Sequence, residues 1–155
     1  MRASDILLEK GRGVVTIGPD RTVHDAICTM NDHKIGALIV TGEGGGVVGI
    51  ITERDVLRMC GERCVHIDQP ALDGTGCPAR VRDVMTADLV VGVPDDRLDY
   101  LMGVMTKSRI RHLPIMDGGQ LVGIISIGDV VSAHLGEAAF ENRMLKDYIH
   151  GLPAH

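Results

Sequence analysis

Two short stretches of the chain each place a hydroxyl residue three positions before an acid, directly after an apolar β-branched run. The first pair is Thr52 and Asp55, and the second is Ser126 and Asp129. This spacing is typical of a helix start, where the hydroxyl accepts from the N3 amide and the acid accepts from the N-cap amide. The same geometry suits ligand chemistry, because free amides at a helix start attract a phosphate and a carboxylate can accept from a ribose diol. The motif alone leaves a structural capping box and a nucleotide site both open.

The two stretches belong to an internal repeat that spans most of the chain. Residues 47–56 return as 121–130, and the positions upstream match after a shift of 75 residues, which becomes 74 where the second hairpin is one residue shorter. Each repeat predicts the order strand, helix, strand, strand, helix, because the apolar pattern changes between strand and helix periods at the same places.

The patterns along the chain predict the following elements. A helix over residues 5–10 is capped by Ser4, and Thr22 with Asp25 forms a capping box for a helix ending near His33. The remaining expected elements are strands over 14–17, 36–41 and 47–51, a glycine-rich hairpin at 42–46, a helix over 53–60, a linker over 60–80 and a separate C-terminal helix over 137–150.

Composition limits the classes of protein that the chain can be. Its 155 residues, 45% of them hydrophobic, can bury one ordinary core or two small cores that need each other. We therefore expect one cooperative unit, in which neither half, cut after residue 78, is stable alone. The absence of Trp and the net charge of −5 argue against non-specific nucleic-acid binding. Because we find no signal peptide and no long apolar segment, we expect a cytoplasmic protein that does not enter a membrane.

The cysteines stand at positions 28, 60, 64 and 77, without a CxxC pair. A reducing compartment predicts free thiols. Cys60, Cys64, His66 and Cys77 could in principle gather a zinc ion, although their spacing differs from the recurring zinc patterns, so no metal is expected. A thiol or metal switch through Cys60, Cys64 and Cys77 is nevertheless the alternative function.

The repeat and its motifs resemble a tandem pair of CBS (cystathionine β-synthase) domains. Each repeat ends in Gly-Ile-Ile-(Thr/Ser)-x-x-Asp, and the second also carries Arg-His-Leu-Pro-Ile-Met-Asp at 111–117. The resemblance covers about residues 12–135. It implies an α/β (α+β) fold in which two repeats, 1–78 and 79–155, pack through their sheets about a pseudo-twofold axis. It also implies two clefts that in this family commonly hold adenosine-containing ligands, in a free-standing Bateman module.

The resemblance assigns binding roles position by position. The ribose-binding acids of the family fall on Asp55 and Asp129, and its phosphate-side hydroxyls fall on Thr52 and Ser126. The adenine in such sites lies between aliphatic side chains and reads main-chain groups of the segment that enters the first strand. The full set that the resemblance implies, with Ile50 and Ile124 as apolar walls, is Arg12, Gly13, Val14, Gly36, Ala37, Ile50, Thr52, Arg54, Asp55, Ala87, Asp88, Leu89, Arg111, His112, Pro114, Ile124, Ser126, Ile127, Gly128 and Asp129.

The two repeats differ where a phosphate would need cations. Arg111 and His112 of the second repeat correspond to Gly36 and Ala37 of the first, so we expect two unequal sites. Arg54 could add a cation to the first site. The alternatives are that Arg111 forms a surface ion pair of little energetic value and that His112 is a satisfied histidine at a sheet edge.

No catalytic grouping is recognisable in the sequence. Ser126 has no histidine at a motif spacing, and neither a P-loop nor an HExxH pair occurs. The expected function is that of a non-enzymatic sensor which binds AMP, ADP, ATP or NAD(H) and signals to an unidentified downstream protein. S-adenosylmethionine or a nucleic acid is a further choice of ligand, and an enzyme acting on a bound nucleotide is the remaining alternative.

The C-terminal helix predicts how the chain assembles. Phe140, Met144 and Tyr148 share one side of this helix and form more apolar surface than a small monomer usually leaves in water. We therefore expect a homodimer. The alternative is that this stripe packs back on the sheet of its own chain.

Overall fold

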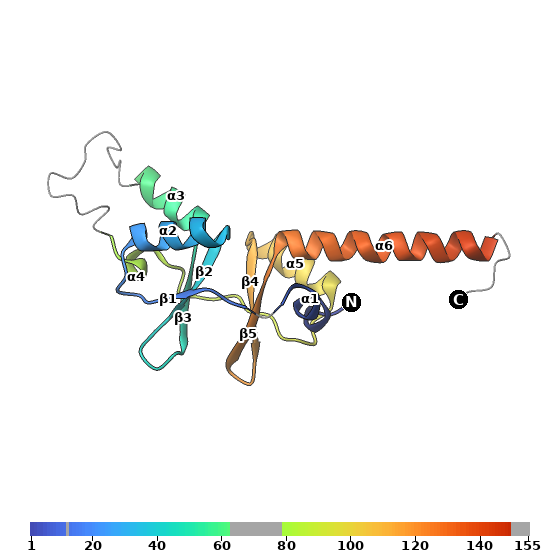
Figure 1. Ribbon diagram of the computed structural model, residues 1–155, viewed down its shortest axis with the longest axis horizontal. Coiled ribbons are helices and arrows are strands. Elements are labelled where there is room, and N and C mark those ends of the chain that lie inside the picture. The colour runs from blue at the N-terminus through green and yellow to red at the C-terminus, as the bar shows by residue number, and fades with distance from the viewer. Residues whose placement is uncertain (12, 63–78, 150–155) are drawn as a thin grey trace. The chain divides into compact units, whose positions relative to one another are not determined.

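The computed structural model describes residues 1–11, 13–62 and 79–149, and it confirms the mixed helix and sheet architecture that the sequence predicts (Figure 1). The chain forms two compact units. The central unit is Gly13–Leu89, and the terminal unit combines Met1–Arg12 with Val90–His155. In chain order the elements are α1 (Ala3–Lys10), β1 (Thr16–Ile17), α2 (Val23–His33), β2 (Ala37–Thr41), β3 (Val47–Thr52), α3 (Glu53–Glu62), α4 (Val81–Val84), α5 (Leu98–Ser108), β4 (His112–Asp117), β5 (Gln120–Ser126) and α6 (Ile127–Ile149).

A three-stranded sheet in the order β1-β2-β3 lies in the central unit. β1 is parallel to β2, and β2 is antiparallel to β3, with Ala37 opposite Thr52. The predicted hairpin joins β2 to β3, and its tip contains Gly44 and Gly45 at φ values of 97° and 82°, which glycine adopts without a steric cost. β1 is shorter than the strand predicted over residues 14–17, but the order of elements is the predicted one.

The sheet of the terminal unit has two strands, β4 and β5, which run antiparallel. The repeat predicts a further strand at Val91, by analogy with β1. Instead, only Gly92 pairs, in an isolated parallel bridge to Ile115. Gly92 stands where the first repeat has Ile17, and glycine has a low strand propensity because it has no side chain to pack. One bridge therefore replaces the predicted strand.

The two short helices that precede the repeats are exchanged between the units. α1 lies on β5 of the terminal unit, where a Cβ added to Gly123 would come within 2.5 Å of Leu7 Cδ2. α4 lies on β3 of the central unit, where a Cβ added to Gly49 would come within 2.7 Å of Met85 Sδ and 3.0 Å of the Thr86 carbonyl oxygen. Each glycine thus admits a helix from the sequence of the other repeat. The compact units therefore differ from the sequence division after residue 78.

Both exchanged helices start in the same way, which corrects the predicted start of the first. α1 begins at Ala3 and not at residue 5, and its N-cap residue is Arg2 rather than Ser4. The Arg2 amide donates to Asp5 Oδ2 at 2.7 Å, which satisfies the backbone at the start of the helix. In α4, which the sequence did not predict, the Arg80 amide donates to Asp83 Oδ2 at 3.0 Å.

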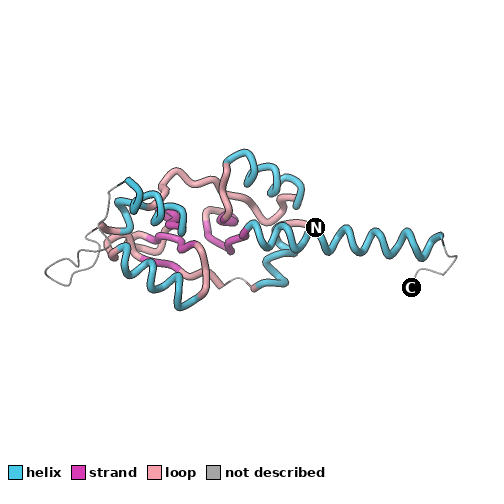
Figure 2. Tube along the Cα trace, turned by 90° about the horizontal axis from the view of Figure 1, so that it is seen from above, coloured by secondary structure: helices cyan, strands magenta, loops and turns pink. Residues whose placement is uncertain are grey.

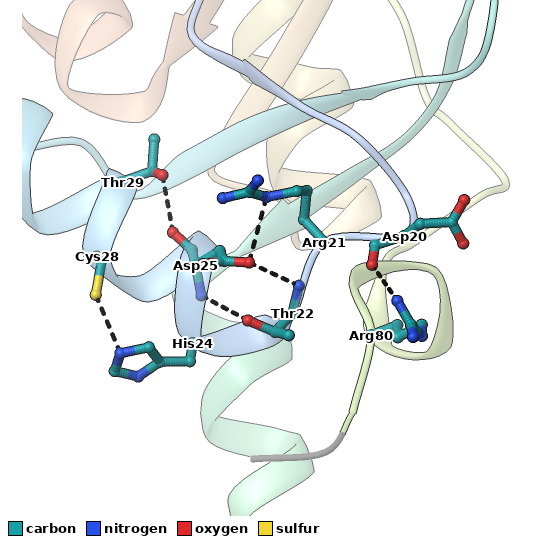
Figure 3. Close-up of polar contacts among 8 residues, drawn as sticks. All are labelled: Asp20, Arg21, Thr22, His24, Asp25, Cys28, Thr29 and Arg80. Atoms are coloured by element: carbon teal, nitrogen blue, oxygen red, sulfur yellow. Dashed lines mark hydrogen bonds and ion pairs between the residues drawn. The ribbon is translucent and has the colours of Figure 1, made fainter. Parts of the chain in front are cut away.

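The start of α2 confirms the predicted capping box (Figure 3). The Thr22 amide donates to Asp25 Oδ2 at 3.1 Å, and the Asp25 amide donates to Thr22 Oγ1 at 3.0 Å. The hydrogen bond from the Thr22 backbone is the main reason why the pKa of Asp25 lies below its ordinary value. Close by, Arg80 Nη1 donates to the Asp20 carbonyl at 2.5 Å, which ties the segment before α4 to the loop before α2.

α6 corrects the prediction of a separate C-terminal helix over residues 137–150. It runs without a break from Ile127 to Ile149, passing through Gly136. A single glycine inside a helix costs only about 1 kcal/mol relative to alanine, so it does not end an otherwise favourable helical segment. The helix after β3 also ends slightly beyond the predicted residue 60, at Glu62.

Candidate functional site

The first acid lies at the junction of β3 and α3. The Thr52 amide and hydroxyl both donate to Asp55 Oδ2 at 2.9 Å, and the Asp55 amide donates to Thr52 Oγ1 at 3.3 Å. The predicted capping box is therefore present. Asp55 is buried, with 7% of its surface exposed, and buried carboxylates need such donors because desolvation disfavours their charge.

The second acid lies at the equivalent junction of β5 and α6, in the same arrangement. The Ser126 amide and hydroxyl donate to Asp129 Oδ2 at 2.7 and 2.8 Å, and the Asp129 amide donates to Ser126 Oγ at 3.2 Å. The capping alternative is thus confirmed at both junctions. It does not exclude ligand binding, because a cap uses only part of the hydrogen-bonding capacity of a carboxylate.

Asp55 and Asp129 differ in the donors that contact them in addition to their capping boxes. In the central unit Thr86 Oγ1 donates to Asp55 Oδ1 at 3.4 Å, and the guanidinium of Arg58 lies 3.7 Å from the same oxygen. In the terminal unit Lys10 Nζ donates to Asp129 Oδ2 at 2.5 Å. Lys10 ends α1 and Thr86 lies in the segment just after α4, so in each unit the additional donor comes from an exchanged helix or from the residues that directly follow it.

Lys10 also gives the second acid its electrostatic character. Burial raises the pKa of Asp129, but the hydrogen bonds from Lys10 and Ser126 outweigh it, so the pKa lies below its ordinary value. The side chains of Asp129 and Lys10 are 22% and 32% exposed, which leaves this ion pair within reach of solvent. The carboxylate at the start of α6 is therefore ionised at neutral pH and accessible.

The strand next to each junction holds the positions at which the repeats were expected to differ. His112 lies opposite Ser126 in the sheet, and the Arg111 carbonyl accepts from the Ile127 amide at 2.8 Å. The equivalent positions of the central unit follow the same pattern, with Ala37 opposite Thr52 and the Gly36 carbonyl accepting from Glu53 at 3.0 Å. The Arg111 side chain is exposed and His112 is half-buried. Only the terminal unit thus carries an Arg-His pair beside its acid.

The other residues of the predicted site fall into three groups. Ile50 and Pro114 are buried, and Ile124 is half-buried, so the two predicted apolar walls differ in access. Arg54, Ile127 and Gly128 are exposed in the first turns of α3 and α6. The strand-entry residues Gly13, Val14, Ala87, Asp88 and Leu89 belong to the central unit, where Val14 and Leu89 are half-buried and the others exposed, and Arg12 lies outside the described residues.

Sequence reasoning missed Lys10, Arg58 and the contact of Thr86 with the first acid. A signal for the helices that supply Lys10 and Thr86 was present. Arg-x-x-Asp followed by two apolar residues occurs at 2–7 and again at 80–85, a shift of 78 rather than 75. This pattern marks α1 and α4 as equivalent elements, although it does not show that they are exchanged.

The cysteine alternative can be followed only in part. Cys28 is exposed and Cys60 is half-buried, both as free thiols. Cys64, His66 and Cys77 lie outside the described residues, so the predicted zinc or thiol cluster is not tested. Within the described ranges no group of three or more metal-ligating side chains occurs. Among the same residues, no helix combines the length and apolar character that crossing a membrane requires.

Comparison with known proteins identifies the repeats. The CBS domain model matches residues 3–62 and 81–136, so each match begins with one of the exchanged helices. The mitochondrial CBS domain-containing protein CBSX3 of Arabidopsis thaliana is 35% identical over 156 aligned residues, which cover 96% of this chain and 71% of that protein.

Solved structures agree with this assignment. The CBS-domain containing protein ATU1752 of Agrobacterium tumefaciens is 40% identical with a TM-score of 0.76, covering 86% of this chain and 99% of its own. The CBS domain pair of protein MJ0100, solved with 5′-methylthioadenosine and S-adenosyl-L-methionine, has a TM-score of 0.72 at 22% identity and covers 88% of this chain and 98% of its own. The matches span both repeats, and the chain belongs to the CBS domain family as a tandem pair.

Proposed function

We propose that this protein is a non-enzymatic regulatory sensor that binds an adenosine-containing ligand at the start of α6, with a weaker site at the start of α3. The position of Asp129 carries the proposal. It is an ionised, partly exposed carboxylate at a helix start, Lys10 lies against it, and Arg111 and His112 lie on the neighbouring strand segment. A ribose acceptor, a positive helix end and cations are the groups that a nucleotide requires.

The geometry of the carboxylate leaves room for this role. Among the described residues, every hydrogen bond to the Asp129 side chain ends on Oδ2. A ribose diol would therefore bind through Oδ1, while a phosphate would approach the first turn of α6 and the guanidinium of Arg111. In this scheme Lys10 moves from the carboxylate to the incoming phosphate, which replaces one charge-assisted contact by another.

The ligand class has support from the family. MJ0100 binds two adenosine derivatives, although at 22% identity this likeness alone shows only a common fold. We propose AMP, ADP, ATP or NAD(H) as the ligand here, because Arg111 and Lys10 favour a phosphate. Chemistry on the bound ligand is not part of the proposal.

Assembly and location complete the proposal. We place the protein in the cytoplasm as a homodimer that passes ligand occupancy to a downstream protein. The mitochondrial name of the Arabidopsis relative makes the compartment a specific question for imaging or fractionation.

Isothermal titration calorimetry tests the ribose contact. Asp129→Ala should weaken adenosine and AMP alike, by about 1.5–3 kcal/mol, or roughly ten- to a hundredfold, because a charged acceptor is lost. Asp55→Ala is the matched variant and should affect only a weaker second site. Thermal melts confirm that each variant is folded at the titration temperature. If Asp129→Ala binds AMP as tightly as the wild type, the acid is only a helix cap.

The phosphate contact has a separate test. Arg111→Ala should weaken AMP while leaving adenosine nearly unchanged, and the wild-type affinity for AMP should fall as salt is added. An equal loss for both ligands would show that Arg111 supports the fold of the site rather than the phosphate.

A further inference from the structure

The distal part of α6 is held to its own unit at its near end, where Glu137 Oε1 accepts from the N-terminal ammonium of Met1 at 2.5 Å, and none of its described side chains beyond Glu137 is buried. Figures 1 and 2 show, from two directions, that this helix runs on beyond the other elements of the terminal unit. Its buried residues, Val130 and Ala133, lie in the first two turns. After Ala133 no described side chain of α6 is buried, and only Glu137 is half-buried. About four turns of helix therefore leave their side chains in solvent.

One face of this exposed part carries a heptad pattern. Successive positions are separated by four, three, four, three and four residues, which is the spacing of the d and a positions of a coiled coil. The residues of this seam are Val131, Leu135, Ala138, Asn142, Leu145 and Ile149, and all of them are exposed. A strict alternation of three and four keeps one narrow stripe facing a partner helix, whereas a helix packed on a globular core needs a wider apolar face.

The single polar residue of the seam has a recognised use. Asn142 occupies an a position, where one asparagine fixes the register and favours two strands at some cost in stability. In a parallel pair of identical helices the two Asn142 amides meet and satisfy each other. In an antiparallel pair each amide would face an apolar d residue and lose its hydrogen bonds, which costs roughly 1–3 kcal/mol.

The charges beside the seam agree with the same arrangement. Glu141 takes a g position and Lys146 takes the e position five residues later. In a parallel coiled coil the g residue of one helix lies beside that e residue of the other, so two Glu–Lys pairs form by symmetry. The helix is therefore complementary to itself in charge as well as in apolar pattern.

We propose that a second copy of this chain covers the seam, so that two α6 helices form a parallel, two-stranded coiled coil. The inference rests on the homodimer of the proposed function and is independent of ligand binding. It also replaces the surface expected from Phe140, Met144 and Tyr148, because Phe140 and Met144 take f and c positions and face away from the seam, while Tyr148 takes a g position beside it. The seam spans fewer than three heptads, so the folded units to which the helices are attached are part of its stability.

Sedimentation velocity on the full chain provides the main test, with a matched pair of variants. Leu145 lies in the seam and Phe140 lies outside it, yet their exposures are nearly equal at 61% and 65%. Leu145→Glu should raise the dimer dissociation constant about tenfold or more, whereas Phe140→Glu should leave it unchanged. Both substitutions are at exposed positions, and a thermal melt shows that the units remain folded.

The outcomes separate the possible failures. A wild type that stays monomeric up to its solubility limit overturns the dimer and the seam together. A wild-type dimer that Phe140→Glu dissociates, and Leu145→Glu does not, overturns the seam and leaves the dimer. A different protein bound to the seam would leave the wild type monomeric until it is added, which also overturns the proposal.

A charge exchange tests the parallel register. Glu141→Lys alone should weaken the dimer by several-fold, and adding Lys146→Glu should restore the affinity because the pairs re-form with reversed sign. Under mild oxidation Asn142→Cys should give a disulfide-linked dimer, whereas Phe140→Cys and the wild type should not. Failure of both the restoration and the cross-link would overturn the parallel coiled coil.

Discussion

The central and terminal units place the same four-residue motif in different surroundings. In both units the hydroxyl and the acid form the same reciprocal cap, at donor–acceptor distances of 2.7–3.3 Å. The acid of the central unit, Asp55, is buried, accepts a hydrogen bond from the Thr86 hydroxyl and has the guanidinium of Arg58 at 3.7 Å. The acid of the terminal unit, Asp129, is partly exposed and meets the ammonium of Lys10. The motif determines the cap, whereas the segments packed against it differ between the units, as do the partners and the exposure of the two acids.

The largest expected effect concerns which residues make a folded unit. A fragment of residues 1–78 lacks α4, so the face of β3 around Gly49 is uncovered, and it should show no cooperative thermal transition. A fragment of residues 13–89 contains α4 and matches the central unit, so it should melt cooperatively, which is a different prediction from the single cooperative unit expected from composition. Circular dichroism during heating distinguishes them. If 1–78 melts sharply and 13–89 does not, the sequence repeats rather than the exchanged units are the folding units.

A smaller effect is expected at the two glycines that admit the exchanged helices. Gly49→Ala would bring the new Cβ within 3.0 Å of the Thr86 carbonyl oxygen, which the backbone cannot easily move, and should cost about 2 kcal/mol of unfolding free energy. Gly123→Ala meets Cδ2, Cδ1 and Cγ of the buried Leu7 side chain, at 2.5, 2.8 and 3.2 Å, and because a side chain can change rotamer where a backbone carbonyl cannot, it should cost less, about 1 kcal/mol. Urea unfolding measures both values. If the two substitutions lower the unfolding free energy equally, the contact with the Thr86 carbonyl does not make the central unit more sensitive than the terminal unit.

The smallest effect is a pH dependence confined to the terminal unit. The pKa of Asp129 is lowered by folding, so its contribution to stability is present above its unfolded value of about 3.9 and is lost as pH falls through the folded pKa. Lys10→Met removes part of the cause. As pH falls from about 5 through the unfolded pKa and below it, the wild type should therefore lose more stability than the variant. Lys107→Met, an exposed lysine elsewhere in the terminal unit, is the control and should behave like the wild type.

Local features of the fold were predictable because their causes are local. The capping box of Thr22 and Asp25 depends on residues three positions apart, and the hairpin between β2 and β3 depends on adjacent glycines. The same holds for the caps at both acids. Recurrence in the second repeat strengthened the predictions of the hairpin and of the caps at both acids, but not that of the α2 cap, because Arg97 and Tyr100 stand where the first repeat has Thr22 and Asp25.

The predictions that failed or were missed depend on contacts between distant segments. The start of α1 at Ala3 depends partly on hydrogen bonds to residues near position 95, because the Ala3 amide donates to the Asp96 carbonyl at 2.9 Å. Lys10 reaches Asp129 only because α1 lies on β5. No periodicity within residues 1–10 contains that information. The partners of the two acids were therefore beyond sequence reasoning, although the acids themselves were not.

The exchange of α1 and α4 also sets an order of events during synthesis. The central unit is one continuous segment and has all its parts once Leu89 has left the ribosome. The terminal unit includes α1, which is synthesised before the central unit but can pack on its sheet only when β5 is complete. At about 5–20 residues per second, β5 is completed several seconds after α1, and the apolar face of α1 stays uncovered until then. During that interval the nascent chain exposes Ile6 and Leu7, so α1 is a natural target for a chaperone.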